Sequence, residues 1–154
     1  MSVKDHPGVY IPPPLIYAGS FFLSLALQKL IPINSSWTSG NKMAGLVCIA
    51  CYLFLFLPAM IRFIRSKNTL VTIKPASSLE TCGIYSFSRN PMYLSLLFLY
   101  GGIAFFKGNS WTFLLIPFLI LAVQYYVISK EEKYLLRTFG NEYDHYKKKV
   151  RRWI

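Results

Sequence analysis

Four apolar stretches alternate with polar loops along the chain. They run from Leu15 to Ile31, from Met43 to Ile64, from Tyr93 to Phe106 and from Trp111 to Ser129. A helix needs about 20 residues to cross the hydrocarbon core of a bilayer, so the second and fourth stretches are long enough, the first is marginal and the third is short. The pattern predicts an all-α integral membrane protein with about four transmembrane helices.

The last two apolar stretches are predicted to form a tight helical hairpin. The turn is "KGNS" at residues 107–110, and Pro91 and Met92 extend the short third helix at its start. The fourth helix is expected to continue through "EEKYLLRTF" to Phe139, where Gly140 is a natural left-handed terminator.

A second short helix is expected after Gly140. It would place Tyr143, Tyr146, Val150 and Trp153 on one face. Such a basic amphipathic helix is typical of a segment that lies on an anionic leaflet. Its other surface would carry Lys147, Lys148, Lys149, Arg151 and Arg152.

Composition and charge agree with a membrane protein. The 154 residues are 54% hydrophobic and 17% aromatic, and the mean hydropathy is +0.39. The formal charge of +11 gathers at the ends of apolar stretches rather than on a soluble face, which argues against nucleic acid as a partner. We expect one domain over residues 1–154, with an N-terminal helix pair in residues 1–64.

The distribution of Lys and Arg predicts the orientation. With both termini in the cytoplasm, the outer loops would hold only Lys29, Lys42 and Lys107 of the 17 basic residues, as the positive-inside rule favours. The loop from Arg65 to Asn90 and the tail from Lys130 to Ile154 would then be cytoplasmic. The N-terminus lacks the pattern of a cleavable signal peptide, so the first apolar stretch is expected to be retained.

The three cysteines indicate neither a disulfide framework nor a metal site. Cys48 and Cys51 lie inside an apolar stretch without His or acidic neighbours, where packing is the simplest interpretation. Cys82, in a polar loop, is a candidate reactive thiol. No metal ligands are predicted.

Arg89, Asn90 and Pro91 stand directly before the third apolar stretch. Asn is a strong N-cap and Pro favours the first helical position, so the helix should present its positive dipole end here. Arg89 adds a fork suited to carboxylate or phosphate, and the combination predicts an anion site. The alternative is an interfacial arginine that snorkels to the headgroups.

Glu131 and Glu132 fall at the same end of the neighbouring helix. One interpretation is a solvated turn neutralised by Lys130 and Lys133. The other is a carboxylate site for a ligand's hydroxyl or ammonium groups. Together with the anion site, the second interpretation suits a zwitterionic ligand, such as an amino acid head joined to a ribose.

The order of these motifs resembles the isoprenylcysteine carboxyl methyltransferase family, including its bacterial members and the related phospholipid methyltransferases. The resemblance rests on "GIYSFSRNPMYLSLLFLYG" and "EEKYLLRTFGNEYDHYKKKVRRWI", within about residues 80–154, and on "DHPGVYIPPPL" at the start. It implies an integral membrane enzyme that binds S-adenosylmethionine in a cytoplasmic pocket of its C-terminal half, residues 80–154. In a bacterium the inner membrane would be its location.

The resemblance also implies a set of site residues. Arg89 and Glu132 are the expected catalytic pair. Two departures stand out: many members have His at the position of Asn90 and Gly at that of Ser95, while His145 is expected to be solvated. The cofactor residues implied are Arg89, Asn90, Pro91, Tyr93, Glu131, Glu132, Tyr143 and Tyr146, of which the three tyrosines are more typical of packing than of direct binding.

The implied reaction is in-line methyl transfer to a lipid or lipid-linked acceptor that enters from the bilayer. A carboxylate acceptor is deprotonated at pH 7 and needs no general base, so the absence of His at position 90 is compatible with ester formation. Three alternatives remain: N-methylation of a phospholipid amine, an NADPH-dependent enzyme of the sterol reductase kind, and a scaffold or transporter without activity.

Overall fold

The described part of the chain is helical throughout. The computed structural model describes residues 7–33, 39–66 and 78–154, and no strand occurs among them. The predicted all-α class is confirmed. The helices are α1 (Pro13–Leu30), α2 (Ser39–Arg65), the 3₁₀ turn η1 (Gly83–Ser86), α3 (Pro91–Lys107), α4 (Ser110–Ala122), the π-helical turn η2 (Val123–Ile128), α5 (Ser129–Phe139) and α6 (Asn141–Lys149).

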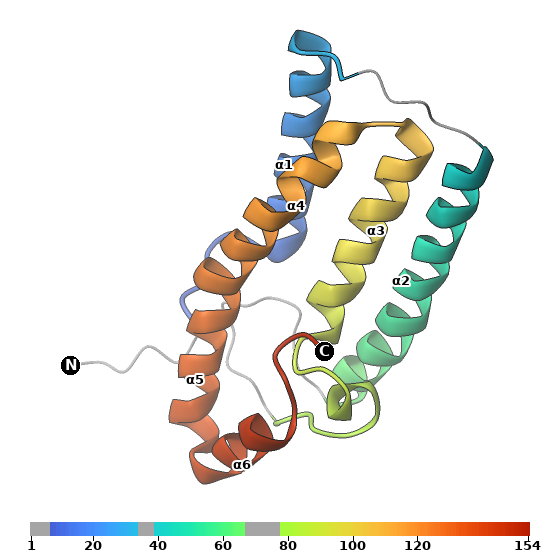
Figure 1. Ribbon diagram of the computed structural model, residues 1–154. Helices are drawn as coiled ribbons and strands as arrows, with labels where there is room; N and C mark the ends of the chain where they lie inside the picture. Colours follow the sequence, from blue (N-terminus) through green and yellow to red (C-terminus); the bar gives the residue numbers. More distant parts are fainter. Residues whose placement is uncertain (1–6, 34–38, 67–77) are drawn as a thin grey trace.

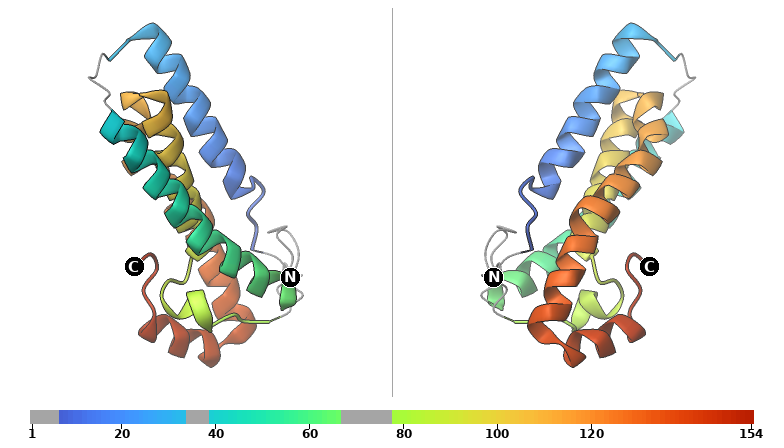
Figure 2. Two further views of the ribbon diagram at one scale, coloured as in Figure 1. Left: turned by 90° about the vertical axis from the view of Figure 1, so that its right-hand side faces the viewer. Right: turned by 90° about the vertical axis from the view of Figure 1, so that its left-hand side faces the viewer.

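The helices α1 to α4 form an elongated bundle (Figures 1 and 2). α2 packs along α3, and α1 packs along α4. At Gly102 on α3 an added Cβ would stand 3.0 Å from Ile49 Cδ1, so glycine allows α2 to approach closely. α5 extends α4 beyond the bundle, and α6 turns back beneath it.

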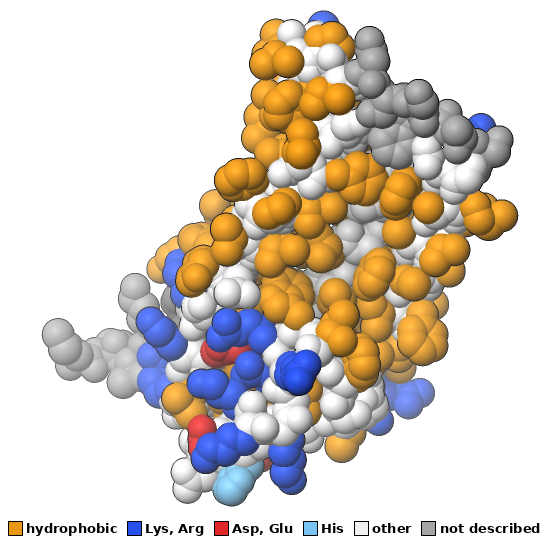
Figure 3. Space-filling view, viewed as in Figure 1, with side chains coloured by type: hydrophobic (Ala, Val, Ile, Leu, Met, Phe, Trp, Pro, Cys, Tyr) orange, Lys and Arg blue, Asp and Glu red, His pale blue; other side chains and the backbone are white. Residues whose placement is uncertain are grey.

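Among the described residues, two helices are long and apolar enough to cross a membrane, Gly40–Arg65 and Ser110–Phe139. Only 17% and 28% of their most apolar parts are buried, whereas a core helix of a soluble protein is mostly buried. Pro91–Lys107 is a shorter apolar helix. Figure 3 shows apolar side chains over the shaft of the bundle and basic ones gathered at its lower end. These are the features of a membrane protein.

The predicted hairpin between α3 and α4 is confirmed. Gly108 ends α3 in the left-handed conformation (φ 62°, ψ 35°), and the Asn109 side chain accepts a hydrogen bond of 3.0 Å from the Trp111 N–H. Ser24 of α1 joins the turn, because its hydroxyl lies 2.9 Å from Thr112 Oγ1 and accepts from Asn109 Nδ2 at 3.2 Å. The hairpin is thereby fastened to α1.

The fourth apolar helix is continuous to Phe139, as predicted, but it is not α-helical throughout. Residues Val123–Ile128 form a π-helical turn. The Gln124 carbonyl accepts from both the backbone N–H and the hydroxyl of Ser129, the latter at 2.8 Å. A π-turn takes up one residue more than an α-turn, so it changes which side chains after Ile128 face α3.

The C-terminal end differs from the prediction. Gly140 ends α5 at a positive φ of 52°, but its ψ of −122° is outside the left-handed helical region. α6 ends at Lys149, and Val150 is extended (φ −118°, ψ 132°). The expected helix through Val150 and Trp153 is therefore wrong. Residues 150–154, called here the C-terminal segment, run back toward the start of α3 (Figure 1).

The described residues test several other sequence predictions only in part. The loop from Arg65 to Asn90 includes residues 67–77, which lie outside the described residues. Cys48 and Cys51 are half-buried in α2, and Cys82 is exposed. His145 is exposed on α6, as expected. The count of four spans and their orientation stay predictions.

Candidate functional site

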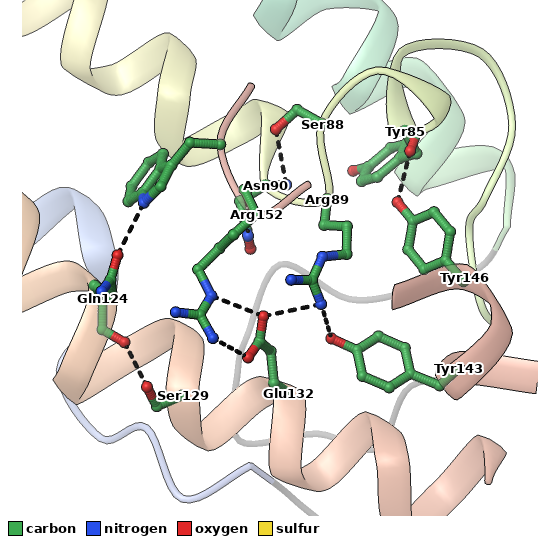
Figure 4. Close-up of polar contacts among 11 residues, drawn as sticks. Tyr85, Ser88, Arg89, Asn90, Gln124, Ser129, Glu132, Tyr143, Tyr146 and Arg152 are labelled. Carbon is green, nitrogen blue, oxygen red and sulfur yellow. Dashed lines mark hydrogen bonds and ion pairs between the residues drawn. The ribbon is translucent and has the colours of Figure 1, made fainter. Parts of the chain in front are cut away.

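Arg89 is the centre of a polar cluster at the basic end of the bundle (Figure 4). Its backbone N–H donates to the Arg151 carbonyl at 3.1 Å, and its side chain is only 9% exposed. Its Nη1 lies 3.1 Å from Glu132 Oε1 and donates to the Tyr143 hydroxyl at 3.3 Å. The interpretation of Arg89 as an arginine that snorkels to the headgroups is wrong, because its guanidinium points into the protein.

Glu132 is held between two arginines. Arg152 donates from Nε to Oε1 at 3.0 Å and from Nη2 to Oε2 at 2.6 Å, a fork that matches the carboxylate plane. The Glu132 side chain is 12% exposed. A solvated turn neutralised by lysines is thus excluded for Glu132, and the Arg152 side chain pairs with this acid instead of joining the exposed lysines of α6. We call these three residues the Arg89–Glu132–Arg152 cluster.

Asn90 stands at the predicted N-cap of α3, but its side chain does not cap the helix. Its Nδ2 instead donates to the Arg152 carbonyl at 2.8 Å. Its backbone N–H is satisfied by the Ser88 hydroxyl at 3.1 Å. The cap prediction was wrong because the returning C-terminal segment offers the amide a tertiary acceptor. Pro91 occupies the first turn of α3, as expected, and is buried.

Glu131 and Glu132 do not form one paired-acid site. Tyr93 donates to Glu131 Oε1 at 2.7 Å, and the Tyr93 carbonyl accepts from Tyr17 on α1 at 2.9 Å. Neighbouring residues on a helix are about 100° apart, so one carboxylate faces α3 and α1 while the other faces the arginines. The two predicted acids therefore belong to two adjacent polar groups.

The two tail tyrosines are buried, as expected of packing residues, and also make hydrogen bonds. Tyr146 donates to the Tyr85 carbonyl at 2.6 Å, which ties α6 to η1. Burial and the Glu132 carboxylate raise the pKa of Tyr143 to about 12, although Arg89 acts in the opposite direction. The Tyr143 phenol therefore stays protonated at physiological pH.

Three residues of this region were not anticipated from the sequence. Arg152 belongs to the cluster, and Trp153 Nε1 donates to Gln124 Oε1 in the π-helical turn at 3.1 Å. Trp153 also packs against the main apolar core. The sequence carried no signal for this arrangement, since Arg152 is one of five basic residues in a run of six.

The sequence model of the family described as phospholipid methyltransferase matches residues 41–142, well over half of the chain. The chain belongs to the phospholipid methyltransferase family. The chain is therefore classed with the methyltransferases of this family, which include the isoprenylcysteine type, and not with sterol reductases, scaffolds or transporters.

Two relatives show how much of this phospholipid methyltransferase family member is similar to known proteins. An uncharacterized protein of Haemophilus influenzae is 44% identical over 63 residues, which are 41% of this chain and all of that protein. A protein-S-isoprenylcysteine O-methyltransferase of Schizosaccharomyces pombe is 32% identical over 108 residues, which are 69% of this chain and 45% of that protein. The chain thus spans less than half of the yeast enzyme's length. No solved structure matches the chain.

Proposed function

We propose that this chain is an S-adenosylmethionine-dependent methyltransferase whose acceptor is a membrane-associated carboxylate, as in isoprenylcysteine carboxyl methylation. The observation that carries the proposal is the convergence of Arg89, Glu132 and Tyr143 at the basic end of an apolar helical bundle. Family membership supplies the reaction class. The 32% identical yeast relative, whose name is that of an isoprenylcysteine O-methyltransferase, favours the carboxylate acceptor.

The residues present fit a zwitterionic cofactor. Arg89 Nε is buried and has no partner among the described residues, so it offers a donor to a carboxylate. Glu131 uses Oε1 to accept from Tyr93, which leaves its second oxygen outside that bond as an acceptor for an ammonium group. Asn90, Pro91 and Tyr146 shape the surroundings. S-adenosylmethionine, when bound, supplies a methyl group activated by its positively charged sulfur.

The chain's own groups would act by positioning and electrostatics. Arg89 orients a carboxylate of the cofactor or of the acceptor. Glu132 holds the Arg89 guanidinium in place, and Tyr143 fixes it from the other side. A carboxylate acceptor arrives without its proton, so no side chain has to serve as a base. Arg89 and Glu132 are thus the pair on which turnover should depend most.

The charge distribution supports a cytoplasmic site. We propose four membrane segments with both termini in the cytoplasm, and the bacterial inner membrane as the location if the source is bacterial. The basic end of the bundle would then face the water-soluble cofactor, while an apolar acceptor approaches through the bilayer. The reaction would take place where the two phases meet.

Calorimetry on the detergent-purified protein tests the cofactor. We expect binding of S-adenosylmethionine and S-adenosylhomocysteine but not of NADPH. Methyl transfer from labelled S-adenosylmethionine to N-acetyl-S-farnesylcysteine should then be measured beside transfer to phosphatidylethanolamine vesicles. Binding of NADPH alone would contradict the proposal, and transfer only to phosphatidylethanolamine would assign the chain to amine N-methylation instead.

A further inference from the structure

The Arg89–Glu132–Arg152 cluster has one more positive than negative charge. Both arginines stay charged at any physiological pH, and Glu132 is the one carboxylate within ion-pair distance of them among the described residues. Glu131 is turned to Tyr93. The side chains of Arg89 and Glu132 are 9% and 12% exposed, and that of Arg152 is 33% exposed, so the cluster is largely withdrawn from water. An excess charge in such a place is unfavourable unless a counter-charge joins it.

The donors that remain are on the arginines, not on the acid. Glu132 already accepts three contacts, from Arg89 Nη1 and from two nitrogens of Arg152, and a carboxylate has about four lone-pair positions. Glu132 is therefore poorly able to receive a ligand's ammonium group. Arg89 Nε is buried without a partner among the described residues, and the Arg152 fork leaves Nη1 outside its pair with Glu132.

We propose that Arg89 and Arg152, held on either side of Glu132, together bind a ligand carboxylate, and that Arg152 is a specificity-determining residue of the site. The inference rests on the proposed function, in which either the cofactor or the acceptor brings such a group. A single carboxylate neutralises the excess charge of the cluster, and its planar shape fits guanidinium nitrogens. An acceptor with a cationic amine would add to the charge.

Arg152 is held in place rather than resting on the surface. Its carbonyl accepts from Asn90 Nδ2 at 2.8 Å, and the preceding carbonyl, of Arg151, accepts from the Arg89 N–H at 3.1 Å. The residue after Arg152, Trp153, donates a hydrogen bond from Nε1 to Gln124 Oε1 at 3.1 Å. The C-terminal segment thus forms one wall of the site, although it lies beyond residues 41–142 that the family model matches.

Paired probes test the proposal on the full-length protein in detergent. S-adenosylhomocysteine carries a carboxylate, and 5′-methylthioadenosine is the same nucleoside thioether without the amino acid head. N-acetyl-S-farnesylcysteine carries a carboxylate, and its carboxamide does not. Binding of the four compounds is measured for wild type, Arg152→Ala, Arg152→Lys and the control Lys149→Ala, which removes one exposed charge from the end of α6.

We expect Arg152→Ala to weaken the binding of one carboxylate probe by about 10-fold or more. The affinity for the carboxylate-free partner of that probe should stay within about twofold of the wild-type value. A loss with S-adenosylhomocysteine assigns the carboxylate to the cofactor, and a loss with farnesylcysteine assigns it to the acceptor. Lys149→Ala should bind all four compounds as wild type does. Arg152→Lys should recover part of the affinity, because it keeps the charge without the fork.

Equal affinities in Arg152→Ala and wild type, or equal losses for both members of each pair, would overturn the proposal. If Arg152→Ala does not fold, Arg152→Lys carries the same test with a smaller expected loss. The result is separable from the proposed function. A protein that binds carboxylates through Arg152 but transfers no methyl group contradicts only the function, and methyl transfer without dependence on Arg152 contradicts only this inference.

Discussion

Arg152 and Glu132 form a forked ion pair across 20 residues of chain, with nitrogen to oxygen distances of 3.0 Å and 2.6 Å. The pair joins the C-terminal segment to the first turn of α5. Because Arg89 contacts the same carboxylate, a single acid links three parts of the chain: the loop before α3, the helix α5 and the C-terminal segment. Loss of that acid should therefore affect both folding and binding.

Glu132→Gln should lower the free energy of unfolding by about 1.5–3 kcal/mol, because it removes the charge from bonds to two guanidinium groups. S-adenosylhomocysteine affinity should also fall, since Arg89 loses its positioning partner. Melting temperatures and calorimetry check both effects. Glu142→Gln, on the exposed surface of α6, is the matched control and should behave as wild type. An unchanged melting temperature in Glu132→Gln would contradict the structural role.

Asn90→Ala and Asn90→Asp should both loosen the C-terminal segment, because each removes the donor to the Arg152 carbonyl. One neutral hydrogen bond contributes about 0.5–1.5 kcal/mol, so exchange of the amide hydrogens in residues 150–154 should rise roughly 2- to 10-fold. Asn90→His keeps a ring N–H donor and should exchange more slowly than the other two variants. Hydrogen exchange with mass spectrometry measures this.

Asn90→Asp separates anchoring from electrostatics. It adds a negative charge beside the Arg89–Glu132–Arg152 cluster. This charge should weaken the binding of S-adenosylhomocysteine further than Asn90→Ala does. Much of the turnover should survive in Asn90→His, with whichever acceptor is found. Wild-type exchange in all three variants would show that the Asn90 amide does not hold the C-terminal segment.

Tyr143→Phe should change the alkaline stability of the protein. The ordinary tyrosine pKa is 10.0, and that of the folded Tyr143 is about 12. Between these values the folded state binds more protons than the unfolded state, so the free energy of unfolding falls as the pH rises. The wild-type advantage over Tyr143→Phe is therefore present below the unfolded pKa and is lost as the pH passes through the folded one.

Thermal melts of wild type and Tyr143→Phe at about pH 8 and about pH 11 measure that difference. At the lower pH the variant should be less stable by about 0.5–1.5 kcal/mol, because Arg89 Nη1 loses one acceptor. The gap should narrow at the higher pH. A gap that is the same at both values would mean that Tyr143 does not titrate in the folded state as its burial implies.

Cysteine labelling tests the proposed orientation of the chain in the membrane. In a background where Cys48, Cys51 and Cys82 are replaced by serine, Lys107→Cys and Lys147→Cys place single exposed thiols at opposite ends of the molecule. A membrane-impermeant maleimide should label Lys107→Cys in intact cells and Lys147→Cys only after lysis. The reverse pattern would put the candidate site on the outside and contradict the proposed topology.

Much of the architecture could be read from local sequence. The apolar stretches, Pro91 at a helix start and the Gly108–Asn109 turn each act through neighbouring residues, and each appears in the structure. Local sequence also made Arg89 a candidate for an anion site and Glu132 a candidate for a carboxylate site, but each had a structural alternative, and only the family resemblance implied that they form a catalytic pair. Their direct contact at 3.1 Å follows from the packing of distant helices.

The C-terminal segment could not be predicted in the same way. Helical periodicity put Val150 and Trp153 in line with Tyr143 and Tyr146, and local propensity had no opposing signal. The structure ends α6 at Lys149 because Arg152 and Trp153 gain partners on α5 and the π-helical turn, Glu132 and Gln124. Such tertiary contacts outweigh helix propensities of a few tenths of a kcal/mol per residue. The same reasoning explains why Asn90 turns from a cap into an anchor.

The π-helical turn at Val123–Ile128 makes the length of this helix part of the site's chemistry. The turn takes up one residue more than α-geometry would, so conversion of these residues to α-geometry at the same chain length would rotate α5 by about 100°, the angle of one residue. Glu132 would then leave Arg89 and Arg152, while the apolar shaft above would be little changed. A relative that lacks one residue in this segment should therefore be α-helical there and keep an acid at the position of Glu132.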